Sequence, residues 1–578
     1  MASSEDSLVH VASVADVREA GPTVVTVDGR SVGLFYEDGT VHALDNRCPH
    51  MGFPLHRGTV DDGVLTCHWH HARFELDCGD TFDLWADDVP THRVEVRDGE
   101  VWIDPEPSMA DPPATHWRNR LRDGLQEDLR LVIAKAVIGL DDADVPAAVP
   151  LEIGAEFGTA FRRAGWGPGL TILTAMANIL DALRPADRRR ALFIGLDRVA
   201  DDCAGEPPRF EREPFDARDV SADRLVRWFR DTVEVRDGTG AERVLRTAIA
   251  GGHDESALAR LVLAAGTDHR YLDSGHRLDF ANKAFELLDH IGWDHAETIL
   301  PSLVTGLADA DRAEESSSWR RPVDLVSLVE AAVEALPDRV PTDEAWTPPA
   351  AFQDHLLADD PHTVIDGVSE AVAAGATPVD LADEVAQAAA TRVAQFSTGN
   401  EFSDWNTVHH TYTYANAVCG LVRRTDAPAG YRAVYDGAVN LYLDRFLNTP
   451  PAPIPEPATP DTDTETILED LGAAFETEGE VATAGRKAAA FLDGGGDPAR
   501  LKRALGRATL REDAGFHVLQ NLEAAIRGFD RSAEPDRGRM HLVATARYLA
   551  AHTPTRREAE QTFRIAERLN RGERIHED

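Results

Sequence analysis

Residues 46–74 read NRCPHMGFPLHRGTVDDGVLTCHWHHARF and carry two Cys-His pairs on either side of a turn-rich insert. One residue separates Cys48 from His50, two residues separate Cys67 from His70, and sixteen residues lie between the pairs. Each pair offers one thiolate and one imidazole, which are ligands that soft and borderline metals prefer. The spacing therefore predicts a metal or iron–sulfur centre held between two loops.

The segments around this stretch have the pattern of short β-strands. Between residues 10 and 104 they are rich in Val, Thr, Phe and Trp, as in TVVTV, SVGLFYE, GVLTCHW and EVWI. The turn signals DGR, EDGT, DDG and RDGE separate these segments at hairpin spacing. The sequence therefore predicts a small all-β domain over residues 1–106.

Two kinds of centre use two cysteines and two histidines. One is a [2Fe-2S] cluster with two thiolates on one iron and two neutral imidazoles on the other. The other is tetrahedral zinc. The zinc-finger order, with both cysteines before both histidines, is absent from this stretch. The residues that flank the two pairs also favour the cluster.

This region resembles the Rieske [2Fe-2S] family over residues 7–106. Beyond the two Cys-His pairs, the shared features are the Pro-His-Met-Gly run, Pro54-Leu55, Trp69, the RFEL run at 73–76 and Gly79. The resemblance implies that the domain transfers single electrons through a [2Fe-2S] cluster. It also implies that the cluster ligands are Cys48, His50, Cys67 and His70.

The two loops indicate which kind of Rieske domain this is. Respiratory members carry an extra cysteine in each loop, and a Ser and a Tyr that donate to the cluster sulfurs. This chain has Phe53 and His68 in place of the cysteines, and Ala72 and Phe74 in place of the hydroxyl residues. Because fewer donors destabilise the reduced cluster, we expect a ferredoxin-type or oxygenase-type potential on the order of −150 mV. His71 stands where the family usually has Gly, and we expect it to face solvent.

After the β domain the apolar pattern changes to a spacing of three and four residues, which is typical of helices. We expect a Pro-rich linker at 107–115, a helical domain at 116–447, a second Pro-rich linker at 448–466 and a C-terminal helical segment at 467–578. The predicted fold is therefore multidomain, with a Rieske-type all-β domain followed by a large all-α region. The helical region is interpreted as a bundle or a helical-repeat array.

The composition excludes several kinds of partner. The net charge is −41, and the chain contains only four lysines. An excess of carboxylates spread along the chain predicts a solvated acidic surface, so nucleic acid and anionic membranes are not expected partners. Such a composition is typical of halophilic proteins. The N-terminus lacks the pattern of a secretory signal and no long apolar run occurs, so we expect a cytoplasmic protein.

A one-electron carrier fused to a large helical region raises the question of where the electron goes. In Rieske oxygenases it reaches an iron held by two His and one carboxylate. The nearest pattern here, 286–295, has its acidic residues at the wrong spacing, so those ligands are not assigned.

Several histidines of the helical region are candidates for a second metal site that would hold additional iron. Asp513 and His517 are spaced at i and i+4, as on one helical face. His276 and His409 are the preferred members, because each lies among aromatic and small residues rather than in a charged run. The alternative is that these side chains serve helix packing or lie at the surface. The candidate residues are His276, His409, His410 and His517.

Two functions fit the sequence. In the first, the chain is a Rieske-coupled oxidoreductase or oxygenase. It would receive electrons from a reductase or ferredoxin and pass them to a metal or a small-molecule substrate in the helical domain. In the second, the Rieske domain is a redox sensor or ferredoxin module on a helical scaffold without catalysis. We predict that the positions of the four candidate histidines distinguish the two.

Overall fold

In the part of the chain that the structure describes, nine short strands near the N-terminus form three antiparallel sheets, each with three strands. Their orders are β1-β9-β8, β2-β3-β4 and β5-β6-β7. The strands are β1 (Val9–Ser13), β2 (Thr23–Val27), β3 (Arg30–Glu37), β4 (Thr40–Asp45), β5 (Thr59–Asp61), β6 (Val64–Thr66), β7 (Arg73–Glu75), β8 (Val94–Arg97) and β9 (Glu100–Ile103).

Asp-Gly pairs close four of the hairpins. Both residues of each pair have positive φ, as a two-residue type I′ turn requires, and this turn matches the right-handed twist of the strands. The prediction of hairpins at these signals is confirmed. The pairs are Asp28-Gly29, Asp38-Gly39, Asp62-Gly63 and Asp98-Gly99.

The computed structural model describes residues 8–575 apart from 110, 217–218, 337–345, 426–427, 456–462 and 533. The chain divides into two units, one made of residues 1–153 and 560–578 and the other of residues 154–559. The all-β domain followed by a large all-helical region is confirmed. Part of the predicted second linker, 456–462, lies outside the described residues.

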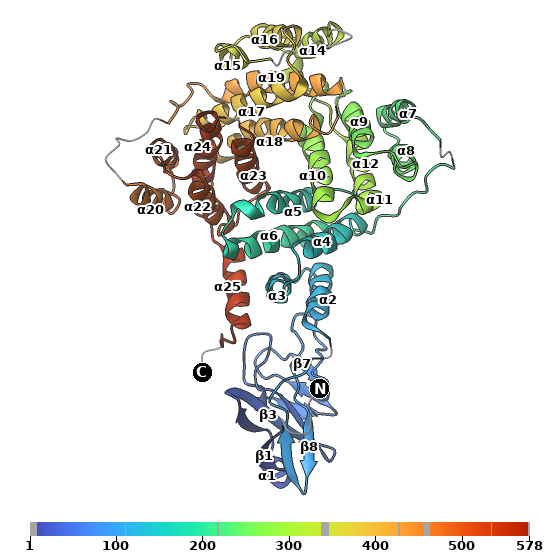
Figure 1. Cartoon of the computed structure of the whole chain (residues 1–578), viewed down its shortest axis with the longest axis vertical. Helices are drawn as coiled ribbons and strands as arrows, with labels where there is room; N and C mark the ends of the chain where they lie inside the picture. Colours follow the sequence, from blue (N-terminus) through green and yellow to red (C-terminus); the bar gives the residue numbers. More distant parts are fainter. Residues whose placement is uncertain are drawn as a thin grey trace. The chain divides into compact units, whose positions relative to one another are not determined.

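The first unit combines the β domain with helices from both ends of the chain (Figure 1). Helices α2 and α3 pack on each other, and α2 begins three residues before residue 116. The helices with residues in this unit are α1 (Val14–Ala20), α2 (Pro113–Gln126), α3 (Arg130–Asp142), the start of α4 (Ala148–Ala160) and most of α25 (Glu558–Asn570).

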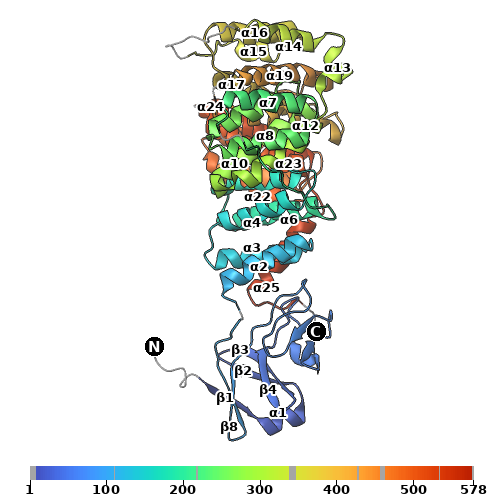
Figure 2. The ribbon, with the colours of Figure 1, turned by 90° about the vertical axis from the view of Figure 1, so that its right-hand side faces the viewer.

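The second unit is helical throughout its described residues (Figure 2). Its α-helices after α4 are α5 (Pro168–Ile179), α6 (Pro185–Cys203), α7 (Ala222–Glu234), α8 (Gly238–Ala250), α9 (Glu255–Gly266), α10 (His276–Ile291), α11 (Ala296–Ile299), α12 (Val304–Asp309), α13 (Ser317–Arg320), α14 (Leu325–Glu334), α15 (Phe352–Leu356), α16 (Pro361–Ala373), α17 (Pro378–Ala394), α18 (Trp405–Leu421), α19 (Ala429–Asp444), α20 (Thr464–Ala474), α21 (Val481–Asp493), α22 (Pro498–Leu510), α23 (Phe516–Arg531) and α24 (Pro535–Ala551).

Four helices from distant parts of the sequence meet inside the second unit. Helix α18 packs against both α10 and α23, and α5 also packs against α10 and α23. Figure 1 shows these helices near one another in the ribbon. Among the described residues, the structure contains no helix with the length and apolar character needed to cross a membrane.

Candidate functional site

The two Cys-His loops have the same backbone hydrogen bonds. In the first loop, between β4 and β5, the Cys48 amide donates to the Phe53 carbonyl at 2.8 Å. In the second, between β6 and β7, the Cys67 amide donates to the Ala72 carbonyl, also at 2.8 Å. Each cysteine therefore lies at the start of a closed six-residue loop, although the spacing to the histidine differs between the loops.

The fourth residue after each cysteine adopts a left-handed conformation. The amides of Gly52 and His71 donate back to the carbonyls of Cys48 and Cys67, at 2.7 and 3.0 Å. Their φ values are +84° and +65°. Only glycine adopts this conformation without steric cost, so His71 carries backbone strain that Gly52 does not. His71 is also exposed, as predicted.

The four predicted ligands gather at the tip of the two loops. The Cys48 and Cys67 thiols are buried and hydrogen-bonded to each other. The His50 and His70 rings lie 4.8 Å apart between centroids, with His50 partly buried and His70 exposed. Thiols on the inside and imidazoles toward the outside give two chemically different ends to the site.

The two cysteine sulfurs and the two histidine rings fit a metal group that takes two thiolate and two imidazole ligands. The hydrogen bond from Cys48 lowers the pKa of Cys67 to about 6, whereas the same contact raises the pKa of Cys48. Burial lowers the pKa of His50 to about 4, so this imidazole is neutral at pH 7. Its Nδ1 atom is buried and has no hydrogen-bond partner among the described residues. A buried imidazole nitrogen without a partner and two paired thiols fit the Cys and His donor set of a Rieske-type [2Fe-2S] cluster.

The surroundings of the thiols are apolar. Both cysteines belong to a buried cluster that also contains Ala72 and Phe74, which have no exposed surface. Trp85 packs edge-on against His50, with 4.7 Å between ring centroids. The described side chains at positions 72 and 74 therefore offer the cluster sulfurs no hydroxyl donor.

Comparison with known proteins agrees with this geometry. Residues 7–91 match the Rieske [2Fe-2S] domain. The chain is also similar to the 3-phenylpropionate/cinnamic acid dioxygenase ferredoxin subunit of Photorhabdus laumondii, at 31% identity over 99 residues. That match covers 17% of this chain and 93% of the ferredoxin.

The chain belongs to the Rieske [2Fe-2S] family. Its Rieske domain binds a [2Fe-2S] cluster. The human Rieske domain-containing protein is 35% identical over 80 residues, which is 13% of this chain and 51% of that protein. Human apoptosis-inducing factor 3 is 31% identical over 94 residues, or 16% of each chain. The chain thus spans about half the length of the first of these two relatives and 16% of the second.

The end of the chain contacts the first loop of the Rieske domain. Arg47, which precedes the predicted ligand Cys48, donates to the carbonyls of Leu569 and Glu573 at 2.7 and 2.8 Å. The Ile575 amide donates to the Met51 carbonyl at 3.2 Å. The end of α25 and the residues that follow it therefore support the loop.

Three of the four histidines predicted as a second site converge inside the second unit. His276 begins α10, His410 lies on α18 and His517 lies on α23. Their candidate ligand nitrogens all lie within 4.8 Å of one another, and the Nε2 atoms of His410 and His517 are 2.9 Å apart. Burial lowers the pKa of each to about 4, so all three are neutral at pH 7, and each has one ring nitrogen with a lone pair.

His409 lies beside this group but is not part of it. Its ring centroid is 5.0 Å from that of His517, and Asn521 contacts its Nδ1 at 3.3 Å. The side chain is fully buried, and its Nε2 has no partner among the described residues. The sequence favoured His409 because of its aromatic and small neighbours, whereas the structure places His410, and not His409, in the group.

The backbone just before His276 is strained. Tyr271, Asp273 and Ser274 all have positive φ, between 43° and 56°, and Gly275 follows at 91°. Non-glycine residues in this region cost free energy, and they cluster at functional sites. The Asp273 carboxylate accepts from the Asp311 amide at 2.7 Å, which helps to hold the segment in place. No sequence motif signalled this strain.

Two of the three histidines line cavities. His410 lines a cavity of about 680 Å³ together with Tyr271, Trp319 and Asp444. His517 lines a smaller cavity of about 150 Å³. The larger volume is within the range that small-molecule sites occupy.

A chain of buried polar side chains continues from the histidines along α10 and α23. Gln520 donates to Asp279, one turn beyond His517 and His276 respectively. Further along, the fully buried Lys283 ammonium donates to Glu286 at 3.0 Å and to Glu523 at 3.2 Å. The Glu286 within the sequence pattern at 286–295 is thus engaged in an ion pair.

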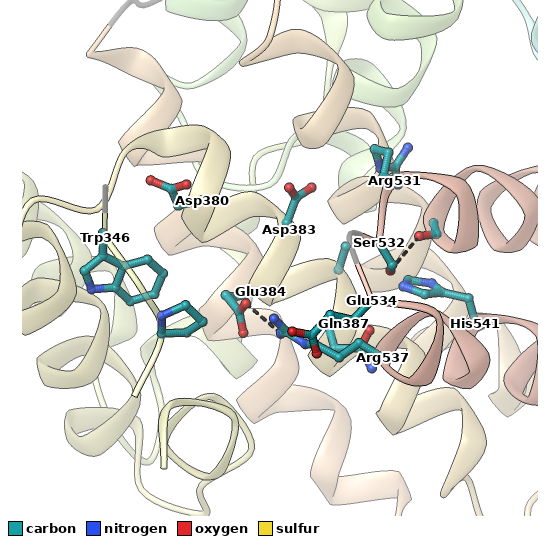
Figure 3. Close-up of a pocket in the computed structure, with 13 residues that line it drawn as sticks. Trp346, Asp380, Asp383, Glu384, Gln387, Arg531, Ser532, Glu534, Arg537 and His541 are labelled. Carbon is teal, nitrogen blue, oxygen red and sulfur yellow. Dashed lines mark hydrogen bonds and ion pairs between the residues drawn. The ribbon is translucent and has the colours of Figure 1, made fainter. Parts of the chain in front are cut away.

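A separate cavity of about 190 Å³ lies between α17 and the α23–α24 corner (Figure 3). Its lining includes Glu384 and Arg537, which form an ion pair at 2.6 Å. His541 also lines it, but its Nδ1 is engaged with the Tyr412 hydroxyl at 2.7 Å. None of the four candidate histidines lines this cavity.

Proposed function

We propose that this chain is a Rieske-coupled oxidoreductase with two metal centres. Cys48 and Cys67 would hold one iron of the [2Fe-2S] cluster, and His50 and His70 would hold the other. The cluster would supply one-electron transfer, with a reductase or ferredoxin as the electron source. His276, His410 and His517 would hold a second, mononuclear iron in the helical unit, which would supply redox chemistry there.

The convergence of His276, His410 and His517 carries the proposal for the second centre. Three neutral imidazoles from three helices form a ligand set that suits iron, copper or zinc. Delivery of single electrons favours a redox-active metal, and three protein ligands leave positions free for small molecules.

The neighbouring residues have roles in binding and positioning. The cavity of about 680 Å³ next to His410 holds the small-molecule substrate. Tyr271 and Trp319, whose stacked rings are 6.3 Å apart between centroids, offer it an apolar wall. The strained segment before α10 fixes the direction in which the His276 imidazole points.

The ratio of iron to acid-labile sulfide in the full-length protein tests this proposal. The cluster alone contains equal numbers of iron and sulfide, so a second centre gives roughly three irons for every two sulfides. His410→Ala and His517→Ala should each lower the ratio to one and leave the sulfide content unchanged. His362→Ala on α16 is the matched control, because that side chain is exposed and far along the chain from the three histidines.

A native ratio of one after anaerobic iron loading would refute the second centre. It would favour the alternative function, in which the Rieske domain is a redox sensor or ferredoxin on a scaffold without catalysis. Loss of sulfide in Cys48→Ser or His70→Ala tests the cluster ligands separately. Full cluster content in either variant would remove that residue from the ligand set.

A further inference from the structure

A buried lysine reaches the first cluster loop from a helix. Lys135 lies in the middle of α3, within the apolar run LVIAKAVIGL, and is 7% exposed. Its ammonium donates to the Pro49 carbonyl at 2.6 Å and to the Asp87 carboxylate at 2.6 Å. Pro49 is the residue between Cys48 and His50. The lysine therefore contacts the peptide that leads into the proposed ligand His50.

The same network holds the residue that packs on His50. Arg120 on α2 pairs with the other oxygen of Asp87 at 3.1 Å. It also donates to the carbonyls of Leu84 and Ala86, which flank Trp85. Lys135 on α3 thus holds the backbone before His50, and Arg120 on α2 holds the backbone on either side of Trp85, whose ring packs on His50.

The network places buried charges of both signs beside the first loop. Lys135, Asp87 and Arg120 are each less than 8% exposed. Arg120 is also balanced by Asp123, which is partly exposed and pairs with it at 2.8 Å. A charge buried in a low-dielectric interior acts more strongly on its surroundings than one in water. Lys135 donates directly to the Pro49 carbonyl, so its charge lies against the peptide that leads into His50.

We propose that Lys135 is a positioning residue for the cluster, and that its charge raises the reduction potential. Reduction adds one negative charge to the cluster, so a nearby cation stabilises the reduced form and a nearby anion destabilises it. Lys135 and Asp87 belong to the same set of contacts, but Lys135 should raise the reduction potential and Asp87 should lower it. The proposal rests on ligation by His50, but it does not depend on a second metal centre.

The opposite signs of these two effects distinguish an electrostatic role of Lys135 from a merely structural one, because structural damage would not reverse its sign between the two residues. In the full-length protein, Lys135→Met removes the cation and should lower the midpoint potential. Asp87→Asn has nearly the same shape and removes the anion, so it should raise the potential. Lys135→Arg keeps the charge and should restore most of the native value. Lys487→Met is the control, because Lys487 is a partly exposed lysine paired with Asp470 in the other unit.

The measurement is a redox titration followed by the EPR signal of the reduced cluster. Shifts of opposite sign for Lys135→Met and Asp87→Asn, with a native value for Lys487→Met, would support the proposal. Shifts of the same sign, or none, would overturn it. If Lys135→Met fails to assemble the cluster, the sign of the Asp87→Asn shift decides alone. Loss of the EPR signal in His50→Ala would confirm His50 as a cluster ligand. Survival of the signal would show that the ligand assignment is wrong, independently of the effect of the Lys135 charge.

Discussion

The Nε2 atoms of His410 and His517 lie 2.9 Å apart, although 107 residues separate the two histidines in the sequence. Both imidazoles are neutral because burial lowers the pKa of each to about 4. Two nitrogens bound at right angles to one metal, each about 2.1 Å from it, lie about 3.0 Å apart. The observed separation is therefore close to that of two adjacent ligands on a single ion.

The neighbouring histidines on α18 should differ in their effect on the second iron. His410→Ala removes a nitrogen that faces His276 and His517, so we expect the second iron to be lost. His409→Ala should retain it, because His409 lies outside that group. Iron and sulfide analysis of the two variants provides the measurement. Equal loss of iron in both variants would show that the site uses His409 as well.

The hairpins and the two loops could be predicted because their signals are local. An Asp-Gly pair determines a type I′ turn by its own backbone preferences. Cys48, His50, Cys67 and His70 lie within 23 residues, so their spacing likewise predicts the set of ligand atoms from a short stretch of sequence.

The second site could be predicted only as a set of candidates. Consecutive residues on a helix point about 100° apart, so the helix orientation decides between His409 and His410. The spacing of Asp513 and His517 suggested a shared helical face, but α23 begins at Phe516. Asp513 instead accepts from the amides of Glu558 and Ala559.

The role of Lys135 was also hidden from sequence patterns. Its one signal was a charge within an apolar helical run, in a chain with only four lysines. Its partners, Asp87 and the Pro49 carbonyl, lie 48 and 86 residues away. Long-range contacts of this kind have no local pattern from which they could be read.

Replacing His71 with glycine should stabilise the Rieske domain. The φ of +65° at His71 is costly for a residue with a Cβ, and glycine removes that cost. Part of the gain is offset by the greater freedom of glycine in the unfolded chain, so we expect an increase of up to about 1 kcal/mol in the free energy of unfolding. Chemical denaturation of the cluster-loaded protein measures it.

Two related substitutions control for this effect. His68→Gly lies in the same loop at a residue without positive φ, and it should not stabilise the domain. Gly52→Ala should destabilise it, because the φ is +84° and the new Cβ would lie 3.1 Å from the Arg574 Cα. Stabilisation by His68→Gly equal to that by His71→Gly would argue against backbone strain as the cause.

Hydroxyl groups placed beside the cluster should raise its potential. Ala72 and Phe74 are fully buried in the same group of apolar side chains as Cys48 and Cys67. Ala72→Ser and Phe74→Tyr would therefore each place an O–H donor within this apolar group. A donor to a cluster sulfur stabilises the reduced form, which carries more negative charge. A redox titration should therefore show a positive shift for each variant and a larger one for the pair. Phe82→Tyr, at an exposed residue, should leave the potential unchanged.

A buried carboxyl group beside the larger cavity should make stability depend on pH. Asp444 is 2% exposed, and burial raises its pKa to about 8. Its Oδ2 atom has no hydrogen-bond partner among the described residues. The folded protein therefore keeps the proton at neutral pH, whereas an unfolded chain releases it near pH 4.

Asp444→Asn should remove this pH dependence. Between about pH 4 and pH 8 the folded state binds more protons at Asp444 than the unfolded state does. The free energy of unfolding is therefore highest below pH 4 as far as Asp444 is concerned, and it falls as the pH rises toward 8. Asparagine has no such proton, so the variant should gain stability relative to the native chain as the pH rises, by at most about 1.4 kcal/mol per pH unit. Unfolding curves at pH 5 and pH 8 provide the measurement, and Asp181→Asn, at a fully exposed side chain, is the control. A difference between variant and native chain that stays constant from pH 5 to pH 8 would mean that Asp444 is ionised in the folded state, with a partner that satisfies its charge.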